Sequence, residues 1–347
     1  MASALGETIA QLQLVQKGGP FQVVQVPKPS VNPDEVLIRQ VFVGLNGLDW
    51  KQRDSGMFVP RWPHVLGVEG AGVIEAIGSD VKDLQLGDEV AAWEVGMVNG
   101  DEWGGAYQEY LVMPARWVAK MPSNVSLEQA ASLPICYATA ICAIHSLGLD
   151  LPIPGPLGKS GSSYTPTSIL ILGGSSSIGA NAIQLLRLVY PSVPIFATSS
   201  PKNQAQVLSL GATQVFDYHK PGLVSSVKAA SPKAAGVDMI IDCLGAGASQ
   251  TDICDSFDPA GSKKYAAILC GITVPVPEDV THIEIDGMVL LELDGGEHVI
   301  PALTDLLERG KYQVPLPVRI VGQYLSAIPD VMDQVKTVSG TKLVVQL

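Results

Sequence analysis

The sequence is short of positive charge, and this limits the partners it can bind. Its 22 Lys and Arg stand against 34 Asp and Glu, a formal net charge of −12, and the basic residues form no block. Nucleic acids and anionic membrane surfaces are bound largely through Lys and Arg, so neither is an expected partner.

Long apolar runs are also missing. No run of about eighteen consecutive apolar residues occurs, so no helix is expected to span a membrane. Residues 1–19 lack the basic segment and apolar core of a secretory signal. We therefore expect a cytoplasmic protein.

Cysteine and histidine are scarce and scattered. The chain has five of each, with no C-x-x-C pair and no histidine spacing typical of a metal site. We expect reduced, mostly buried thiols without a catalytic role, in agreement with a cytoplasmic location.

What the sequence does contain is typical of a two-domain α/β protein. Its 347 residues are too many for one ordinary core, and 47% of them are apolar. Residues 1–123 hold short β-branched runs separated by turns, whereas residues 124–297 hold strands that alternate with helices. We place domain boundaries after residues 123 and 297, which leaves 298–347 as a third segment.

Local signals place the helices and one long loop. Ser126, with acidic and amide residues behind it, starts a helix that the alanine-rich stretch continues to residue 147. Residues 148–168, rich in Pro, Gly and Ser, are expected to form a surface loop. Beyond them the spacing predicts a parallel, doubly wound sheet, and a further helix is expected over 297–312.

A dinucleotide-binding turn is predicted within "ILILGGSSSIGANAIQLLR" (169–187). A buried strand runs into a glycine–serine turn and opens a helix, whose positive N-terminus can bind a pyrophosphate. Gly174 and Gly179 occupy the outer positions of G-x-G-x-x-G, and Ser176 replaces the middle glycine. The expected contacts are Gly174, Ser175, Ser176, Ser177, Ile178 and Gly179. The alternative is a glycine turn used only for packing.

The end of the second strand bears on the choice of cofactor. An NAD site has an acidic residue there for the ribose hydroxyl, but this sequence has Ser199, Ser200 and Lys202. Hydroxyls and a cation suit a 2′-phosphate, so NADPH is the predicted cofactor. Tyr218 is a further candidate contact. Alternatively, Lys202 is a solvated lysine and Tyr218 a packed strand-end residue.

Three segments in order resemble the medium-chain dehydrogenase/reductases: "VLGVEGAGVIEAIGSDVKDLQLGDEV", "GAYQEYLVMPARWVAKMP" and "GGSSSIG". The resemblance covers residues 20–347. It implies a GroES-like, β-rich catalytic domain, then a Rossmann domain, and a return of the C-terminal segment to the first domain.

The same resemblance indicates that a metal site has been lost. Zinc-dependent members have a cysteine where this chain has Asn46 and a histidine where it has Val68. A catalytic zinc needs three protein ligands, and residues 80–130 contain no cysteine for a structural zinc. We expect no metal, and therefore hydride transfer to an acceptor already polarised by conjugation.

"LNGLDWK" resembles the zinc-free quinone oxidoreductase and enoyl reductase branch. The proline-rich insert and "LLRLVYPSVPIFATSSPKN" resemble the fungal trans-acting enoyl reductases. The resemblance implies that Lys51 and Thr139 line the substrate pocket and that Asn46 and Asp49 shape its floor. The cofactor contacts also implied are Leu244, Cys270 and Gly271. Some enoyl reductases of the family have a proton-donating tyrosine shortly after this motif, where this chain offers only Phe58. Lys51, or water held by it, is therefore the expected proton source. Alternatively, Lys51 is a surface lysine and Thr139 an ordinary helix residue.

The expected function is zinc-independent, NADPH-dependent reduction of an activated double bond. The best candidate is a trans-acting enoyl reductase whose substrate is held by a carrier protein of a partner polyketide synthase. Two alternatives remain open at this point: a quinone or enone reductase acting on free small molecules, and an NADPH-binding protein without redox activity.

Overall fold

The computed structural model describes residues 7–94, 104–161, 164–268 and 273–347. Cys270 and Gly271, two of the predicted cofactor contacts, lie outside the described residues. The chain divides into two compact units. The domain boundaries that we placed after residues 123 and 297 remain predictions. The ranges of the first unit are 1–135, 300–310 and 317–347, and those of the second are 136–299 and 311–316.

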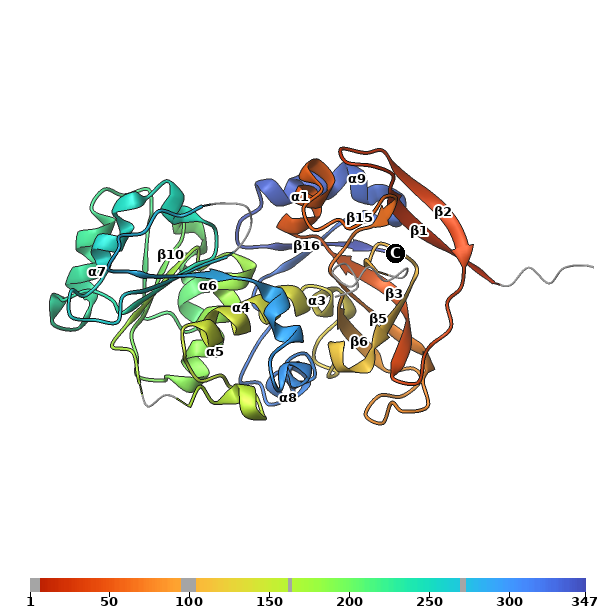
Figure 1. Ribbon diagram of the computed structural model, residues 1–347, viewed down its shortest axis with the longest axis horizontal. Helices are drawn as coiled ribbons and strands as arrows, with labels where there is room; N and C mark the ends of the chain where they lie inside the picture. The colour runs from red at the N-terminus through yellow and green to blue at the C-terminus, as the bar shows by residue number, and fades with distance from the viewer. Residues whose placement is uncertain (1–6, 95–103, 162–163, 269–272) are drawn as a thin grey trace, which may run out of the picture. The chain divides into compact units, whose positions relative to one another are not determined.

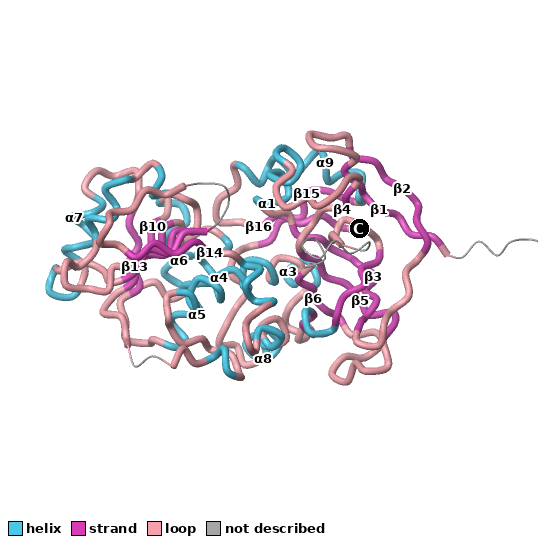
Figure 2. Tube along the Cα trace, viewed as in Figure 1, coloured by secondary structure: helices cyan, strands magenta, loops and turns pink. Residues whose placement is uncertain are grey.

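The first unit is built on two sheets (Figures 1 and 2). In its described part, one sheet has the order β2-β1-β4, and the other runs β15-β16-β3-β5-β6-β8 with β7 also paired to β3. Every pairing given for these strands is antiparallel except that of β15 with β16. The strands are β1 (Thr8–Leu14), β2 (Phe21–Pro27), β3 (Glu35–Gly44), β4 (His64–Val65), β5 (Glu69–Ile77), β6 (Glu89–Trp93), β7 (Tyr110–Pro114), β8 (Val118–Lys120), β15 (Val318–Gln323) and β16 (Lys342–Gln346).

The glycines that precede and interrupt β5 are required by close backbone contacts. Gly67 has φ 96°, and a Cβ there would meet the Tyr107 ring at 2.6 Å. A Cβ on Gly72 would meet the carbonyl oxygen of Arg39 on β3 at 2.0 Å. The glycine spacing therefore serves the sheet, whether or not a metal ligand stands between the glycines.

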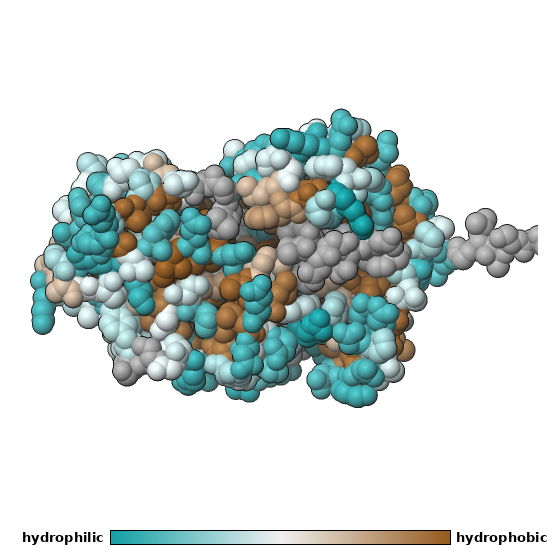
Figure 3. Space-filling view, viewed as in Figure 1, coloured by the Kyte–Doolittle hydropathy of each residue, from teal (hydrophilic) through white to brown (hydrophobic). Residues whose placement is uncertain are grey.

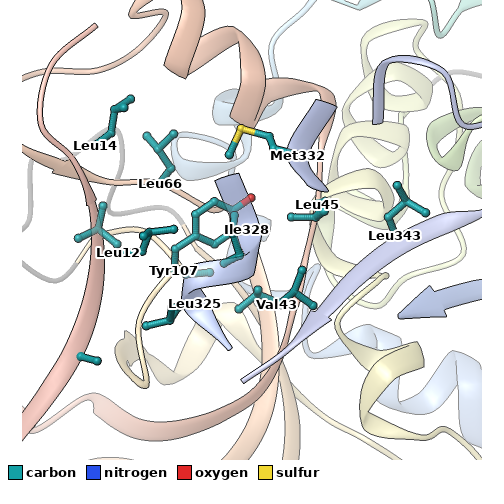
Figure 4. Packing of buried hydrophobic residues seen from close by; sticks show 14 residues of the cluster. Leu12, Leu14, Val43, Leu45, Leu66, Tyr107, Leu325, Ile328, Met332 and Leu343 are labelled. Atoms are coloured by element: carbon teal, nitrogen blue, oxygen red, sulfur yellow. The ribbon is translucent and has the colours of Figure 1, made fainter. Parts of the chain in front are cut away.

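Helices of the first unit are short. Those within the described residues are α1 (Gly47–Ser55), α3 (Leu127–Ala130), α8 (Ala302–Glu308) and α9 (Ile328–Val331). The unit's core gathers apolar side chains from β1, β3, β16 and α9 around the ring of Tyr107, and Figure 4 shows this ring among Leu12, Val43 and Leu325. The C-terminal segment is thus part of the first unit's core.

The second unit contains a parallel sheet with helices packed along it (Figures 1 and 2). Within the described residues the sheet has six strands in the order β11-β10-β9-β12-β13-β14, all paired in parallel. The fold class expected from the sequence is confirmed. The strands are β9 (Ile169–Leu172), β10 (Ile195–Thr198), β11 (Gln214–Phe216), β12 (Met239–Asp242), β13 (Lys264–Ile268) and β14 (Thr281–Ile285); the helices are α4 (Pro134–Ser146), α5 (Ser177–Val189), α6 (Gln204–Ser209) and α7 (Leu223–Ala230).

Two predicted helices differ from the observed ones. The helix expected over 126–147 is split into α3 and α4, because Pro134 disfavours helical backbone at the residue before it and is itself well suited to a first helical position. The helix expected over 297–312 is confined to α8, Ala302–Glu308.

One apolar stretch of the described chain, Leu127–Ser146, is long and apolar enough to cross a membrane by composition. However, 72% of its apolar window is buried inside the protein, which is typical of a core helix. The surface of the protein differs from this buried stretch: in Figure 3 the face around α7 is largely hydrophilic.

Candidate active site

A buried polar cluster lies at the N-terminus of α1, where β3 ends. Asn46 precedes the helix, Asp49 lies in its first turn, Glu69 begins β5, and Lys342 begins β16. Asp49 and Glu69 have no exposed surface, while Asn46 and Lys342 are 7% and 5% exposed. Two predicted pocket residues, Asn46 and Asp49, are therefore brought together with two charged residues from distant strands.

Lys342 joins the members of this cluster. Its Nζ donates to Asn46 Oδ1 at 2.5 Å and lies 2.6 Å from Glu69 Oε1. Asn46 Nδ2 donates to the same Glu69 oxygen at 2.9 Å. The result is a closed triangle of one cation, one anion and one amide.

Glu69 is held from the opposite side as well. Its Oε2 accepts the backbone N–H of Ile135 at 3.0 Å. A Cβ on Gly44 would lie 2.6 Å from Glu69 Oε1, so the end of β3 leaves room for the carboxylate only because residue 44 is glycine. Both oxygens of this buried carboxylate are used.

Asp49, which is also fully buried, has a shifted pKa. Burial raises the pKa of Asp49 to about 7, although the neighbouring Tyr107, the Asn46 N–H and the charge of Lys342 all act to lower it. Asp49 Oδ2 accepts the N–H of Asn46 at 2.6 Å, whereas Asp49 Oδ1 and the Tyr107 hydroxyl have no hydrogen-bond partner among the described residues. Burial therefore favours the protonated form of this carboxyl.

The predicted pocket residues Lys51 and Thr139 belong to different units. Lys51 is on α1, two residues beyond Asp49, and its half-buried side chain places Nζ 5.6 Å from the centre of the Trp50 ring. Thr139 is on α4 and is 8% exposed. Their roles stay predictions.

The predicted dinucleotide turn has the conformation that its sequence requires. Gly173, rather than Gly174, has the positive φ of 81°, and a Cβ on Gly179 would meet the Gly173 carbonyl oxygen at 2.3 Å. Ser176 caps α5, since its Oγ accepts the N–H of Gly179 at 3.1 Å. The first N–H groups of α5 therefore begin directly behind a close-packed turn, as an anion site needs.

The predicted adenosine-phosphate edge follows β10 and β11. Ser199 is 1% exposed, and its hydroxyl donates to Ser175 Oγ at 3.0 Å, which ties the two turns together. Lys202 is exposed, and Tyr218, 43% exposed, stacks on His219 with ring centres 4.1 Å apart. The one carboxylate in this turn, Asp217, is bound to its own neighbour His219 at 2.9 Å.

Comparison with known proteins identifies the family. Residues 32–123 match the alcohol dehydrogenase GroES-like domain and residues 177–294 the zinc-binding dehydrogenase domain. The chain is 30% identical to the dehydrogenase orsE of Emericella nidulans, over 96% of this chain and 98% of that protein. The protein is a medium-chain dehydrogenase/reductase. The resemblance found in the sequence is confirmed.

Other relatives of this medium-chain dehydrogenase/reductase bear on its branch and fold. It is 31% identical to the trans-enoyl reductase himH of Aspergillus japonicus, over 90% of each chain. An alcohol dehydrogenase superfamily protein from Novosphingobium aromaticivorans has the same fold, with a TM-score of 0.81, 22% identity, and coverage of 98% of this chain and all of that one. The chain is thus an oxidoreductase of a family that uses a nicotinamide cofactor.

The family match includes zinc-binding members, but this chain's residues do not fit a catalytic zinc. The two expected ligand positions are Asn46 and the fully buried Val68, and Glu69 is already neutralised by an ammonium group. A zinc site needs three thiolate, imidazole or carboxylate ligands. Over the residues that the structure describes, no group of three or more His, Cys, Asp and Glu could hold a metal ion.

Three residues of this dehydrogenase/reductase were missed or underrated in the sequence. Lys342, at the start of the last strand, gives little signal in the sequence, and Tyr107 gives none. Asp242, at the end of β12, is fully buried and accepts the N–H groups of Ala246 and Gly247, each at 2.9 Å. It shapes the loop that holds the predicted cofactor contact Leu244, and its signal was a lone carboxylate ending an apolar strand.

Proposed function

We propose that this protein is a zinc-independent, NADPH-dependent enoyl reductase that acts in trans on an acyl chain held as a thioester by a polyketide-type carrier protein in the cytoplasm. The observation that carries the proposal is the Asn46–Glu69–Lys342 triangle, in which an amide stands at one expected zinc-ligand position and the carboxylate of Glu69 is paired with the ammonium group of Lys342. Relatives of about this length named trans-enoyl reductases support the substrate class.

The reaction balances without a metal. An enoyl thioester, NADPH and a proton give the saturated thioester and NADP⁺. The nicotinamide supplies the hydride when bound. The chain's own part is to bind and orient both partners and to deliver the proton to the α-carbon, a role that we assign to Lys51 or to a water held by it.

Selectivity for NADPH is proposed from the edge that follows β10 and β11. Ser200 and Lys202 offer a hydroxyl and an ammonium group, while the Asp217 carboxylate is engaged by His219. A 2′-phosphate gains from both features, whereas a free ribose hydroxyl gains little from them.

The test is turnover of three acceptors with purified protein: a short enoyl thioester, the same chain on a carrier protein, and a free quinone. We expect thioester reduction with NADPH, and about a hundredfold lower kcat for Lys51→Ala, with the exposed Lys82→Ala as control. Lys202→Ala should raise the KM for NADPH about tenfold and leave that for NADH unchanged.

The alternatives give different results. Rapid turnover of the quinone alone contradicts the thioester assignment and supports a quinone reductase. NADPH binding without oxidation by any acceptor supports a protein without redox activity. Deuterium from labelled NADPH at the α-carbon, instead of the β-carbon, contradicts the proposed direction of hydride transfer.

A further inference from the structure

We propose that Lys342 is a positioning residue that performs, in this zinc-free site, the charge-balancing and ligand-orienting work of a metal ion. It neutralises the buried Glu69 and fixes the carboxamide of Asn46 at the start of α1. The catalytic readout of this inference rests on the proposed function, but its structural readout does not.

The first step is electrostatic. Glu69 has no exposed surface, and a buried carboxylate is stable in its charged form only with a counter-charge or several hydrogen-bond donors. Lys342 Nζ provides the charge at 2.6 Å, and the side chain of Lys342 is itself almost fully buried. The pair is isolated from solvent, so water cannot stabilise either charge in place of its partner.

The second step is orientational. An asparagine carboxamide has one accepting and one donating end, and a half-turn of the side chain exchanges them. Here Oδ1 faces the ammonium group of Lys342 and Nδ2 faces the carboxylate of Glu69. In the reversed orientation the Asn46 NH₂ group would face the ammonium group of Lys342, and the Asn46 oxygen would face the carboxylate of Glu69. The ion pair therefore favours the observed orientation of Asn46.

The third step links Asn46 to α1. Asn46 is the residue before the nine-residue helix Gly47–Ser55, and its N–H is bound by Asp49 Oδ2 at 2.6 Å. Lys51 lies in this same short helix. Loss of the anchor at Asn46 loosens the first turn and with it the side chain that we assign to proton delivery.

The position of Lys342 explains why the C-terminal strand is needed at this site. Lys342 is 296 positions from Asn46, and β16 pairs with β3, the strand that leads into Asn46. The pairing aligns Val344 with Gly44, which brings the first residue of β16 to the end of β3.

The test uses Lys342→Met, Lys342→Arg and the double variant Glu69→Gln/Lys342→Met, with the exposed Lys82→Met as control. Amide hydrogen exchange of residues 47–55 is measured in each, together with kcat and the KM for NADPH. We expect Lys342→Met to speed exchange in α1 and to lower kcat at least about tenfold with little change in KM, and Lys342→Arg to recover part of both.

The double variant separates positioning from stability. Neither position of the former ion pair then carries an unpaired buried charge, so the melting temperature should recover toward the wild-type value even if Lys342→Met folds poorly. Its kcat should stay low, because Asn46 Oδ1 still lacks the ammonium group of Lys342.

Two results would overturn the inference: unchanged exchange in α1 on loss of Lys342, or full recovery of kcat in the double variant. If the wild-type protein reduces no acceptor, the proposed function fails, whereas the exchange of α1 still decides the role of Lys342.

Discussion

The protonation of Asp49 makes a prediction that can be worked out in detail. Burial raises the pKa of Asp49 from 3.8 to about 7, so the native state binds this proton more tightly than the unfolded chain does. Its contribution to stability is complete below the unfolded pKa and is lost as the pH rises through 7. The whole effect is on the order of 4 kcal/mol, at about 1.4 kcal/mol for each pKa unit.

Asp49→Asn removes the titratable carboxyl group and keeps a side-chain oxygen that can accept the N–H of Asn46. The wild-type free energy of unfolding should fall by about 2 kcal/mol more than that of the variant between pH 5.5 and pH 8. All five tryptophans lie within residues 1–135 of the sequence, so urea unfolding followed by tryptophan fluorescence reports the first unit.

The exposed Asp83→Asn is the matched control, because a solvated carboxylate in the same unit should give no such difference. A constant gap between wild type and Asp49→Asn across this pH range would refute the reasoning. It would mean that Asp49 is ionised in the native state throughout this pH range and that burial does not keep its carboxyl protonated.

Two further predictions concern the second unit. Gly179→Ala places a Cβ 2.3 Å from the Gly173 carbonyl oxygen and should destabilise the protein by roughly 1–3 kcal/mol and weaken NADPH binding; an unchanged Kd by fluorescence titration would contradict the close-packed turn. Burial raises the pKa of Cys142 to about 12 and of Cys254 to about 11, so a thiol reagent at pH 8 should modify neither in the native protein and both in urea, as mass spectrometry of peptides would show. Native labelling of Cys142 would show that α4 opens.

The predictions that succeeded from sequence rest on local patterns. The strand, glycine–serine turn and helix at 169–189 follow from an apolar run, small residues and an amphipathic stretch that lie next to one another in the chain. Four cysteines, Cys136, Cys142, Cys243 and Cys254, are buried and free, as their scattered positions indicated. Such features need no knowledge of distant contacts.

The split between α3 and α4 shows where local patterns mislead. The alanine-rich composition favours one helix, but Pro134 within it separates α3 from α4. Ser199, a predicted cofactor contact, shows a second limit of sequence patterns. The sequence places Ser199 at the end of a strand, but whether its hydroxyl faces a ligand or Ser175 depends on the neighbouring turn.

By itself the sequence determined that this protein is a medium-chain dehydrogenase/reductase with Asn46 and Val68 in the places of two zinc ligands, since residue identity at a motif position is a local fact. Only the tertiary structure decided what stabilises that site instead. Lys342 reaches Asn46 and Glu69 through strand pairing across most of the chain, and Asp49 acquires its pKa of about 7 from burial. Charge balance in a buried cluster depends on distances and solvent exclusion, and neither is a property of the local sequence.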